Sequence, residues 1–286
     1  MTRATVSQFS SKGPRPFAGL SLARPLVMGI INVTPDSFSD GGEVAGEDAV
    51  QRGKAMLAAG ADILDVGGES TRPGAAPVSI ADELARILPV VTALSKLGAV
   101  VSIDTRKAAI MTAAVDAGAT VINDVTALEG EADSLAAAAQ TGAAVILMHM
   151  QGEPGTMQDN PVYDDAPADV AAYLAGRIAA CEAAGIPRTR IAVDPGIGFG
   201  KTVDHNLEIL ARLDEIAALG CPVVLGTSRK SFIGHLAGAN GAKDRLAGSL
   251  ASALAGVARG ADILRVHDVA ETVQAVKVWQ AIEGAP

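Results

Sequence analysis

The chain has 286 residues, of which 49% are hydrophobic and 19% charged, so it can bury the core of one large domain or of two ordinary ones. The formal net charge of −9 argues against a surface that binds nucleic acid or an anionic membrane. No apolar run approaches the roughly 20 residues needed to span a bilayer. An anionic substrate would therefore have to be met locally, by a few basic side chains or by a metal.

The cysteines and the N-terminal segment bear on the cellular compartment and on where the folded domain begins. Cys181 and Cys221 lie far apart and form no ligand motif, which favours a reduced, cytoplasmic protein with two buried thiols. Residues 1–24 are basic and contain no acidic residue, but they lack the apolar segment of a secretory signal. We expect a loose tail over residues 1–24 that joins a folded domain near Phe17.

From Leu26 onward one unit repeats: an apolar strand, a polar tip, an alanine-rich helix and a glycine that ends the helix. The sequence Ala61–Val66 (ADILDV) returns almost unchanged as Ala261–Val266 (ADILRV). The expected strands are 26–31, 62–66, 100–103, 120–122, 143–148, 191–193, 222–225 and 262–266. The expected helices are 47–59, 80–97, 107–117, 131–140, 169–184, 203–219, 243–259 and 269–282.

Eight such units in about 260 residues match the size of a (β/α)8 TIM barrel of the α/β class, here a single domain over residues 25–286. Pro89 should kink or split the second helix. An open, doubly wound sheet is the alternative. The near-identity of the second and last units favours a closed ring of equivalent positions.

Active sites of such barrels lie at the carboxyl ends of the strands. Each of the eight expected strands ends in at least one hydrogen-bonding or charged side chain. These ends are Asn32, 69–74, Asp104–Thr105, Asn123–Asp124, Met148–His149, 194–196, 227–230 and 265–268.

The types of side chain at this rim suggest a ligand. Arg265 and His267 can point a guanidinium and an imidazole at one anion, although a surface pair is the alternative. Carboxylate, amide and ammonium groups at four further positions suit a flat heterocycle with alternating donors and acceptors. These positions are Asp104, Asn123, Asp194 and Lys230. Asp104 and Asp194 could instead cap the helices that follow them.

Other motifs carry less. The glycines at 196, 198 and 200 around Phe199 do not have the spacing of a nucleotide-binding loop, and the sequence contains no P-loop lysine pattern. His149, His205 and His235 are expected to be structural. Neither a Ser-His-Asp arrangement nor zinc-ligand spacing is visible.

Seven strand-end motifs resemble those of dihydropteroate synthases, in the same order and from about residue 27 to about residue 277. They are 32–42 (NVTPDSFSDGG), 67–74 (GGESTRPG), 102–105 (SIDT), 122–125 (INDV), 194–201 (DPGIGFGK), 228–234 (SRKSFIG) and 265–268 (RVHD). The resemblance implies that 4-aminobenzoate attacks the methylene of 6-hydroxymethyl-7,8-dihydropterin diphosphate. The products would be 7,8-dihydropteroate and diphosphate, in folate biosynthesis, and sulfonamides would compete with aminobenzoate.

The resemblance also implies roles for individual residues. Asn32 would contact Mg²⁺ and the diphosphate, which Thr71, Arg265 and His267 would also bind. The pterin ring would contact Asp104, Asn123, Met148, Asp194, Phe199 and Lys230, of which Asp104, Asp194 and Lys230 would be catalytic. Aminobenzoate would be bound by Phe38, Thr71, Arg72, Pro73, Phe199 and Ser231.

Two rival functions share part of this pattern. A methyltetrahydrofolate:corrinoid methyltransferase would share the ring contacts but would need neither a diphosphate site nor an aminobenzoate pocket, so the first loop and the Ser228–Ser231 motif argue against it. A non-enzymatic pterin-binding module is disfavoured because every position carried over from the family is filled by the expected residue type. A homodimer is expected from the family, through helices of the last units.

Overall fold

The structure is a computed structural model that describes residues 16–33, 42–69, 78–152 and 156–285. Eight parallel strands lie in the order β8-β7-β6-β5-β4-β3-β10-β9. A parallel bridge between Val193 and Val223 joins β8 to β9, so the sheet closes into a barrel. The strands are β3 (Leu26–Asn32), β4 (Ile63–Gly67), β5 (Val100–Asp104), β6 (Val121–Asp124), β7 (Ala144–Met148), β8 (Ile191–Asp194), β9 (Val224–Leu225) and β10 (Ile263–Val266).

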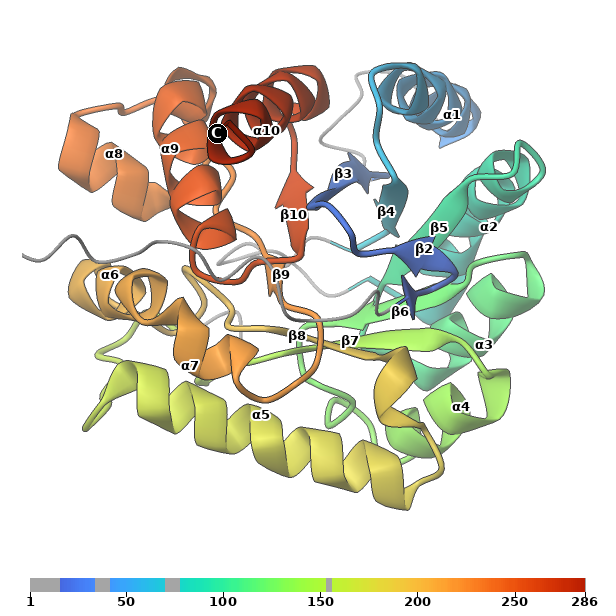
Figure 1. Cartoon of the computed structure of the whole chain (residues 1–286). Coiled ribbons are helices and arrows are strands. Elements are labelled where there is room, and N and C mark those ends of the chain that lie inside the picture. Colours follow the sequence, from blue (N-terminus) through green and yellow to red (C-terminus); the bar gives the residue numbers. More distant parts are fainter. Residues whose placement is uncertain (1–15, 34–41, 70–77, 153–155, 286) are drawn as a thin grey trace, which may run out of the picture.

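Helices surround this barrel (Figure 1). They are α1 (Gly42–Ala58), α2 (Ile80–Ser95), α3 (Ala108–Asp116), α4 (Ser134–Thr141), α5 (Ala166–Ala183), α6 (Val203–Ala211), α7 (Leu213–Ala217), α8 (Ser231–Ala237), α9 (Leu246–Val257) and α10 (Val269–Glu283). The closed (β/α)8 barrel expected from the sequence is thus the observed fold.

One helix prediction was wrong, and another was wrong in part. Pro89 lies inside α2, which continues through it, so the expected split does not occur; the expected kink stays a prediction. The single helix expected over 203–219 is two helices, because Arg212 leaves the helical region with φ −118° and ψ 32°.

The repeated Asp62 and Asp262 have equivalent structural roles. Asp62 Oδ2 accepts a hydrogen bond from the backbone N–H of Val27, at 2.9 Å. Asp262 Oδ2 accepts one from the backbone N–H of Val223, at 2.8 Å. Each carboxylate therefore satisfies a backbone donor at the start of the neighbouring strand, which explains why the same residue recurs at this point of the unit.

The alternation of side chains along the strands separates an apolar lower layer of the interior from a polar upper layer. The lower layer contains Leu26, Met28, Ile63, Val121, Ile146 and Ile263, which belong to one buried cluster. Two residues further along, the same faces carry Asp65, Asn123, Met148 and Arg265. The polar site therefore lies directly above a packed floor.

A short hairpin of β1 (Pro16–Phe17) and β2 (Leu20–Ser21) adds Phe17 to the lower cluster, with its side chain fully buried. Its two turn residues, Ala18 and Gly19, have φ values of 49° and 79°. Positive φ at both positions is typical of the tight turn that suits a twisted two-stranded hairpin. Residues 16–21, which belong to the tail expected to be loose, thus pack against the end of the barrel.

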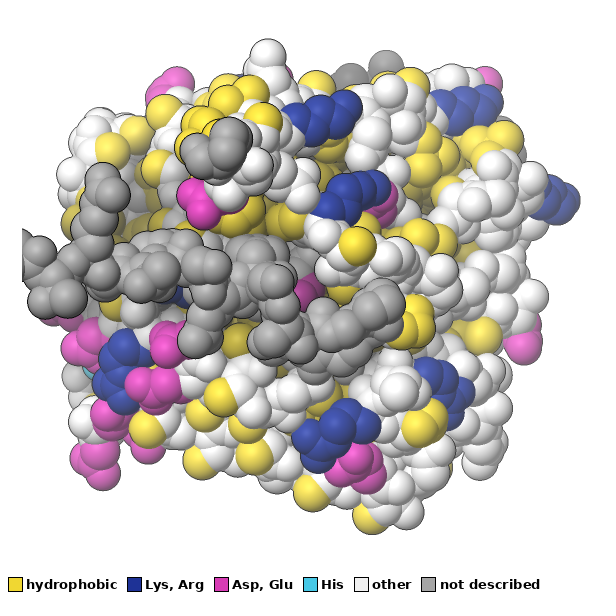
Figure 2. Space-filling model, viewed as in Figure 1, with side chains coloured by type: hydrophobic (Ala, Val, Ile, Leu, Met, Phe, Trp, Pro, Cys, Tyr) yellow, Lys and Arg dark blue, Asp and Glu magenta, His cyan; other side chains and the backbone are white. Residues whose placement is uncertain are grey.

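A second and larger apolar cluster lies between the strands and the surrounding helices. On the face shown in Figure 2, acidic and basic side chains are scattered among hydrophobic and uncharged ones. Within the described ranges, no helix combines the length and the apolar character that crossing a membrane requires.

Candidate active site

Arg265 is the centre of the polar layer. Its Nε donates to Asp65 Oδ2 at 2.7 Å, and its Nη2 donates to Asp104 Oδ2 at 2.6 Å. The Asn123 amide donates to the same Asp65 oxygen at 3.2 Å. The side chains come from β10, β4, β5 and β6, so four strand ends meet around one guanidinium.

Burial and charge act in opposite directions here. Burial raises the pKa of Asp104 to about 7; the charge of Arg265 opposes this, while the charges of Asp65, Asp124 and Glu83 reinforce it. Burial disfavours the charge of Arg265, but Asp65 and Asp104 outweigh it and raise the pKa of the guanidinium. One fixed cation thus faces two carboxyl groups, one of which titrates close to neutrality.

Asp194, at the end of β8, and Lys230, after β9, form a second group. Asp194, 5% exposed, accepts a 2.7 Å hydrogen bond from the Gly196 N–H, and burial raises its pKa against that bond and the nearby cations. The Lys230 ammonium lies 4.0 Å from the centre of the Phe199 ring, a cation–π contact. Burial lowers the pKa of Lys230 to about 8; Arg265 lowers it further, and Asp194 and Asp104 oppose the shift.

The loop before α8 holds Lys230 in place. Arg229 has a positive φ of 60°, which few non-glycine residues adopt, and two contacts hold it there. The Arg229 guanidinium pairs with Asp268, and the Arg229 backbone N–H donates to Ser249 Oγ at 2.9 Å. Lys230 follows directly, as the residue that precedes α8.

Arg265 lies in β10 and His267 follows that strand directly, but the two side chains contact different groups. His267 Nδ1 lies 3.0 Å from Ser228 Oγ, and the His267 N–H donates to that oxygen. Arg265 is held by the two carboxylates. The sequence expectation of one shared anion for this pair therefore stays a prediction.

The remaining expected residues are placed as follows. Met148 is buried at the end of β7, and Asn32 is half-buried at the end of β3. Ser231 is exposed at the first position of α8. Phe38, Thr71, Arg72 and Pro73 lie outside the described residues.

Comparisons with known proteins identify the family. The pterin binding enzyme family matches residues 28–267. The dihydropteroate synthase of Escherichia coli is 51% identical over 264 residues, which cover 92% of this chain and 93% of that protein. The chain belongs to the dihydropteroate synthases.

Solved structures agree with this family. A dihydropteroate synthase of Xanthomonas albilineans with 4-aminobenzoic acid has a TM-score of 0.88 and 49% identity, covering 94% of this chain and 97% of that one. A structure of the enzyme from the same organism with 7,8-dihydropteroate has a TM-score of 0.85 and 46% identity, covering 93% and 97%. Dihydropteroate synthases are transferases, and so is this chain.

Sequence reasoning missed Asp65, although this residue lies at the centre of the dihydropteroate synthase site. The side chain is 1% exposed and contacts both Arg265 and Asn123. The signal was present, because a lone carboxylate between Leu64 and Val66 in a buried strand requires a partner. Asp124, which follows Asn123 on β6, has a different role. It accepts hydrogen bonds from the backbone N–H groups of Thr126 and Leu128 and shapes a turn.

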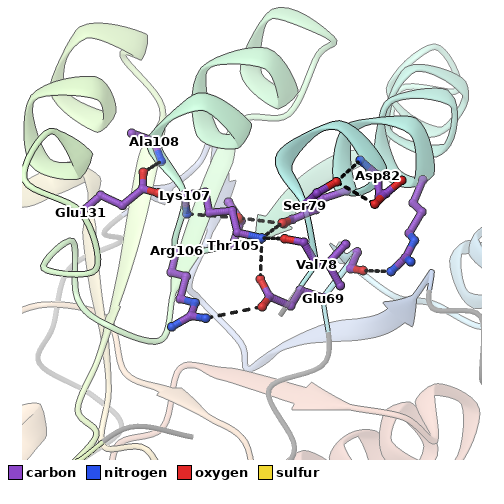
Figure 3. Close-up of polar contacts among 12 residues, drawn as sticks. Glu69, Val78, Ser79, Asp82, Thr105, Arg106, Lys107, Ala108 and Glu131 are labelled. Atoms are coloured by element: carbon purple, nitrogen blue, oxygen red, sulfur yellow. Dashed lines mark hydrogen bonds and ion pairs between the residues drawn. The ribbon is translucent and has the colours of Figure 1, made fainter. Parts of the chain in front are cut away.

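Sequence reasoning also missed a polar cluster around Lys107, beside the loop that begins after β4 (Figure 3). Lys107 Nζ donates to Glu69 Oε2 at 2.8 Å, to Glu83 Oε2 at 2.6 Å and to the Val78 carbonyl at 2.6 Å. The other Glu83 oxygen accepts from Thr105 Oγ1 at 2.9 Å, and this glutamate is fully buried. Lys107 therefore ties together Glu69 and Val78, the residues that flank 70–77.

Proposed function

We propose that this dihydropteroate synthase condenses 6-hydroxymethyl-7,8-dihydropterin diphosphate with 4-aminobenzoate, giving 7,8-dihydropteroate and diphosphate. The observation that carries the proposal is the convergence of two carboxyl groups, an amide and a guanidinium above the apolar floor, with Asp194 and Lys230 after β8 and β9 at the same end of the barrel. The relatives with 4-aminobenzoic acid and 7,8-dihydropteroate support the same chemistry.

The pterin ring would fill this polar layer. Such a ring carries N–H donors along one edge and ring-nitrogen and oxo acceptors beside them. Carboxylates accept from the donors, whereas the Asn123 amide and the Lys230 ammonium donate to the acceptors. Met148 and Phe199 would contact the faces of the ring, and the apolar floor would keep water from its underside.

In the proposed reaction the bond between the pterin methylene carbon and the diphosphate oxygen breaks, and both electrons leave with the diphosphate. The resulting cation is delocalised into the ring, where the negative charge of Asp104 favours it. The aminobenzoate nitrogen then forms the new carbon–nitrogen bond and loses one proton to solvent or to the departing anion. Because these groups are fixed before the reaction, they need little reorganisation as charge develops.

Asn32 would hold Mg²⁺ together with the diphosphate. Mg²⁺ usually keeps several waters and phosphate oxygens, so one amide oxygen at the rim fits an ion that arrives with its substrate. Within the described parts of the chain, no group of three or more His, Cys, Asp or Glu side chains is placed to form a metal cage, and this fits the same picture. When bound, the ion would neutralise charge on the leaving group. Thr71, Arg265 and His267 would contact the same anion.

Aminobenzoate would bind above the pterin. Ser231, exposed at the start of α8, would bind the carboxylate of aminobenzoate. Phe199 would line the aminobenzoate pocket on the side of the pterin. Phe38, Thr71, Arg72 and Pro73 would complete that pocket from the two loops that carry them.

We also propose a homodimer. A groove of about 400 Å³ lies among α6, α8 and α9, and its lining includes Leu207 and Leu236, which are 38% and 57% exposed. A second copy would cover these side chains. Loss of the dimer in a Leu236→Arg variant, measured by analytical ultracentrifugation, would support this assignment; an unchanged mass would contradict it.

The cytoplasm is the compartment we propose, and its support is that Cys181 and Cys221 are both buried thiols and are not joined in a disulfide. We further propose a single barrel domain over residues 25–286, preceded by residues 1–24, of which the hairpin at 16–21 packs against the end of the barrel.

The test of function is diphosphate release by the purified chain with both substrates and Mg²⁺, followed with single-site variants. Asp194→Ala should weaken pterin binding about 10–150-fold, which corresponds to losing one charged hydrogen bond of about 1.5–3 kcal/mol. Normal pterin binding combined with a much lower melting temperature would mean that Asp194 is only structural. Absence of diphosphate release with both substrates would refute the proposed reaction.

A pH profile tests the role of Asp104. The pKa of its carboxyl group is raised to about 7, so the carboxylate form should increase as pH rises through that value. We expect kcat/KM to rise over the same range and to be low and flat in Asp104→Asn. An Asp104→Asn enzyme with the same rise would assign the titration to another group.

A further inference from the structure

Lys201 lies at the end of the β8–α6 loop, and its side chain is 3% exposed. Its ammonium contacts the carbonyl oxygens of Gly196 at 3.0 Å, Phe199 at 2.9 Å and His149 at 3.3 Å. The fourth contact is His149 Nδ1 at 3.0 Å. The four groups around the ammonium are therefore three backbone carbonyls and one imidazole.

His149 is a neutral ring whose Nδ1 contacts the Lys201 ammonium. Burial, and then the charge of Lys201, lower its pKa to about 3. The ring packs edge-on against Tyr173, with 5.0 Å between the ring centres. Because His149 follows β7 directly, Lys201 joins the ends of β7 and β8, which are also linked by the His149 N–H and the Asp194 carbonyl at 3.0 Å.

The loop glycines allow the carbonyls to converge. Gly196 has φ +67°, and a Cβ there would lie 1.9 Å from the His149 carbonyl oxygen. Gly200 has φ +59°, and its Cβ would lie 2.3 Å from the Gln151 carbonyl oxygen. No larger residue fits either position, so the loop is pressed against the end of β7 with its carbonyls turned to the ammonium.

The groups that Lys201 holds adjoin the proposed pterin contacts. Gly196 presents its carbonyl to Lys201 and its N–H to Asp194 Oδ1, at 2.7 Å. Phe199 presents its carbonyl to Lys201 and its ring to the Lys230 ammonium. A movement of Gly196 or Phe199 away from Lys201 would therefore shift the Asp194 carboxylate or the Phe199 ring.

We propose that Lys201 is a positioning residue for the pterin site, which sets the direction of the Asp194 carboxylate and the Phe199 ring by gathering the loop carbonyls. The inference rests on the proposed assignment of Asp194 to pterin binding. A buried ammonium is costly, and methionine would fill the same space with only apolar atoms. The hydrogen-bonding ability of the lysine, rather than its volume, is therefore what the loop uses.

The experiment is a double-mutant cycle on pterin diphosphate affinity, measured by calorimetry with Mg²⁺. The four proteins are the wild type, Lys201→Met, Asp194→Ala and the double variant. Lys201→Met should weaken binding by about tenfold, the effect expected when one charged hydrogen bond is misdirected. In the Asp194→Ala background the same change should cost less than about threefold, because coupled sites are not additive.

Tyr163→Phe is the matched control. The Tyr163 hydroxyl donates to the Gly200 carbonyl at 2.7 Å, so its loss loosens the same loop at the end away from Asp194. We expect pterin affinity within twofold of wild type. Lys201→Gln, which retains two N–H donors, should lie between wild type and Lys201→Met, and it replaces Lys201→Met in the cycle if that variant does not fold.

The possible outcomes distinguish the site assignment from the role of Lys201. If Asp194→Ala binds pterin normally, the site assignment fails. If Asp194→Ala loses affinity while Lys201→Met or Lys201→Gln binds as wild type, only the role of Lys201 is refuted. Equal losses from the lysine change in both backgrounds would refute the positioning of Asp194, because they would show an effect that does not pass through that carboxylate.

Discussion

Two lysines lie at the mouth of the barrel, and the structure holds them by different means. Lys107, after β5, contacts two glutamates and a carbonyl. Lys201, after β8, contacts three carbonyls and a neutral imidazole. Burial disfavours the charge of both, but the glutamates raise the pKa of Lys107, whereas the pKa of Lys201 falls to about 7.

The difference shows what each cation contributes. Lys107 balances the charge of a fully buried glutamate, so the fold depends on its charge. Lys201 contacts carbonyls and an imidazole instead, and it orders the backbone of one loop. The first lysine should therefore matter most for stability, and the second for the geometry of the pterin site.

Lys107→Met should have the largest effect on stability. The change leaves Glu83 buried without its cation, and breaking such a pair costs about 3–5 kcal/mol. Chemical denaturation at pH 7 measures the free energy of unfolding. A loss below about 1 kcal/mol would mean that Glu83 takes up a proton at little cost and that the pair is not needed.

Lys201→Met should cost less, about 1–3 kcal/mol, since the groups that lose a donor are neutral carbonyls. The Gly196 carbonyl also keeps its hydrogen bond from the Phe199 N–H. The same denaturation measurement checks this, and a loss larger than that of Lys107→Met would reverse the comparison.

The pH dependence of these losses should also differ. The pKa of Lys201 falls from 10.5 to about 7 on folding, so between these values the unfolded chain binds a proton that the folded chain does not. Stability from Lys201 should therefore rise with pH across this window, and the gap between wild type and Lys201→Met should widen. His149, Asp194 and Lys230 act on the same lysine and must be intact.

Lys107 should behave in the opposite way. Its pKa is raised from 10.5, so its contribution is fully present below 10.5 and is lost only above that value. Lys107 itself should therefore add no pH dependence to the gap between wild type and Lys107→Met from about pH 7 to about pH 10. Parallel behaviour of the two lysines in denaturation series would show that both are held as charged groups.

Arg106→Met should have the smallest effect. Arg106 is 35% exposed in its side chain and lies 3.4 Å from Glu69, at the edge of the Lys107 cluster. Such exposed pairs contribute about 0–1 kcal/mol. A larger loss in denaturation would extend the cluster to this arginine.

The sequence predicted the regular parts of this molecule well, because strands and helices repeat with fixed periods. It placed Asp104, Asn123 and Asp194 at strand ends, where the structure has them. It did not find the pairing of Asp65 with Arg265, which are 200 residues apart. Such contacts depend on barrel closure and on the register between strands, neither of which the local pattern contains.

The two lysines were missed for a related reason. Lys107 follows a strand-end motif, and Lys201 ends a glycine-rich one, so in the sequence both look like ordinary loop residues. Only the three-dimensional arrangement shows that one neutralises Glu83, from α2, and the other collects carbonyls from two strand ends. The expected roles of residues 71–73 and of Phe38 stay predictions, since they lie outside the described residues.

The most direct test of the comparison is to titrate both substrates against both lysine variants. Pterin diphosphate is titrated with Mg²⁺, and aminobenzoate is titrated with Mg²⁺ and diphosphate present. We predict that Lys201→Met loses pterin affinity and keeps aminobenzoate affinity within about threefold. Lys107→Met should lose more aminobenzoate affinity than pterin diphosphate affinity, because Lys107 holds Glu69 and Val78, which flank three expected aminobenzoate residues, of which only Thr71 is also expected at the diphosphate. Equal losses of both ligands in both variants would contradict the account.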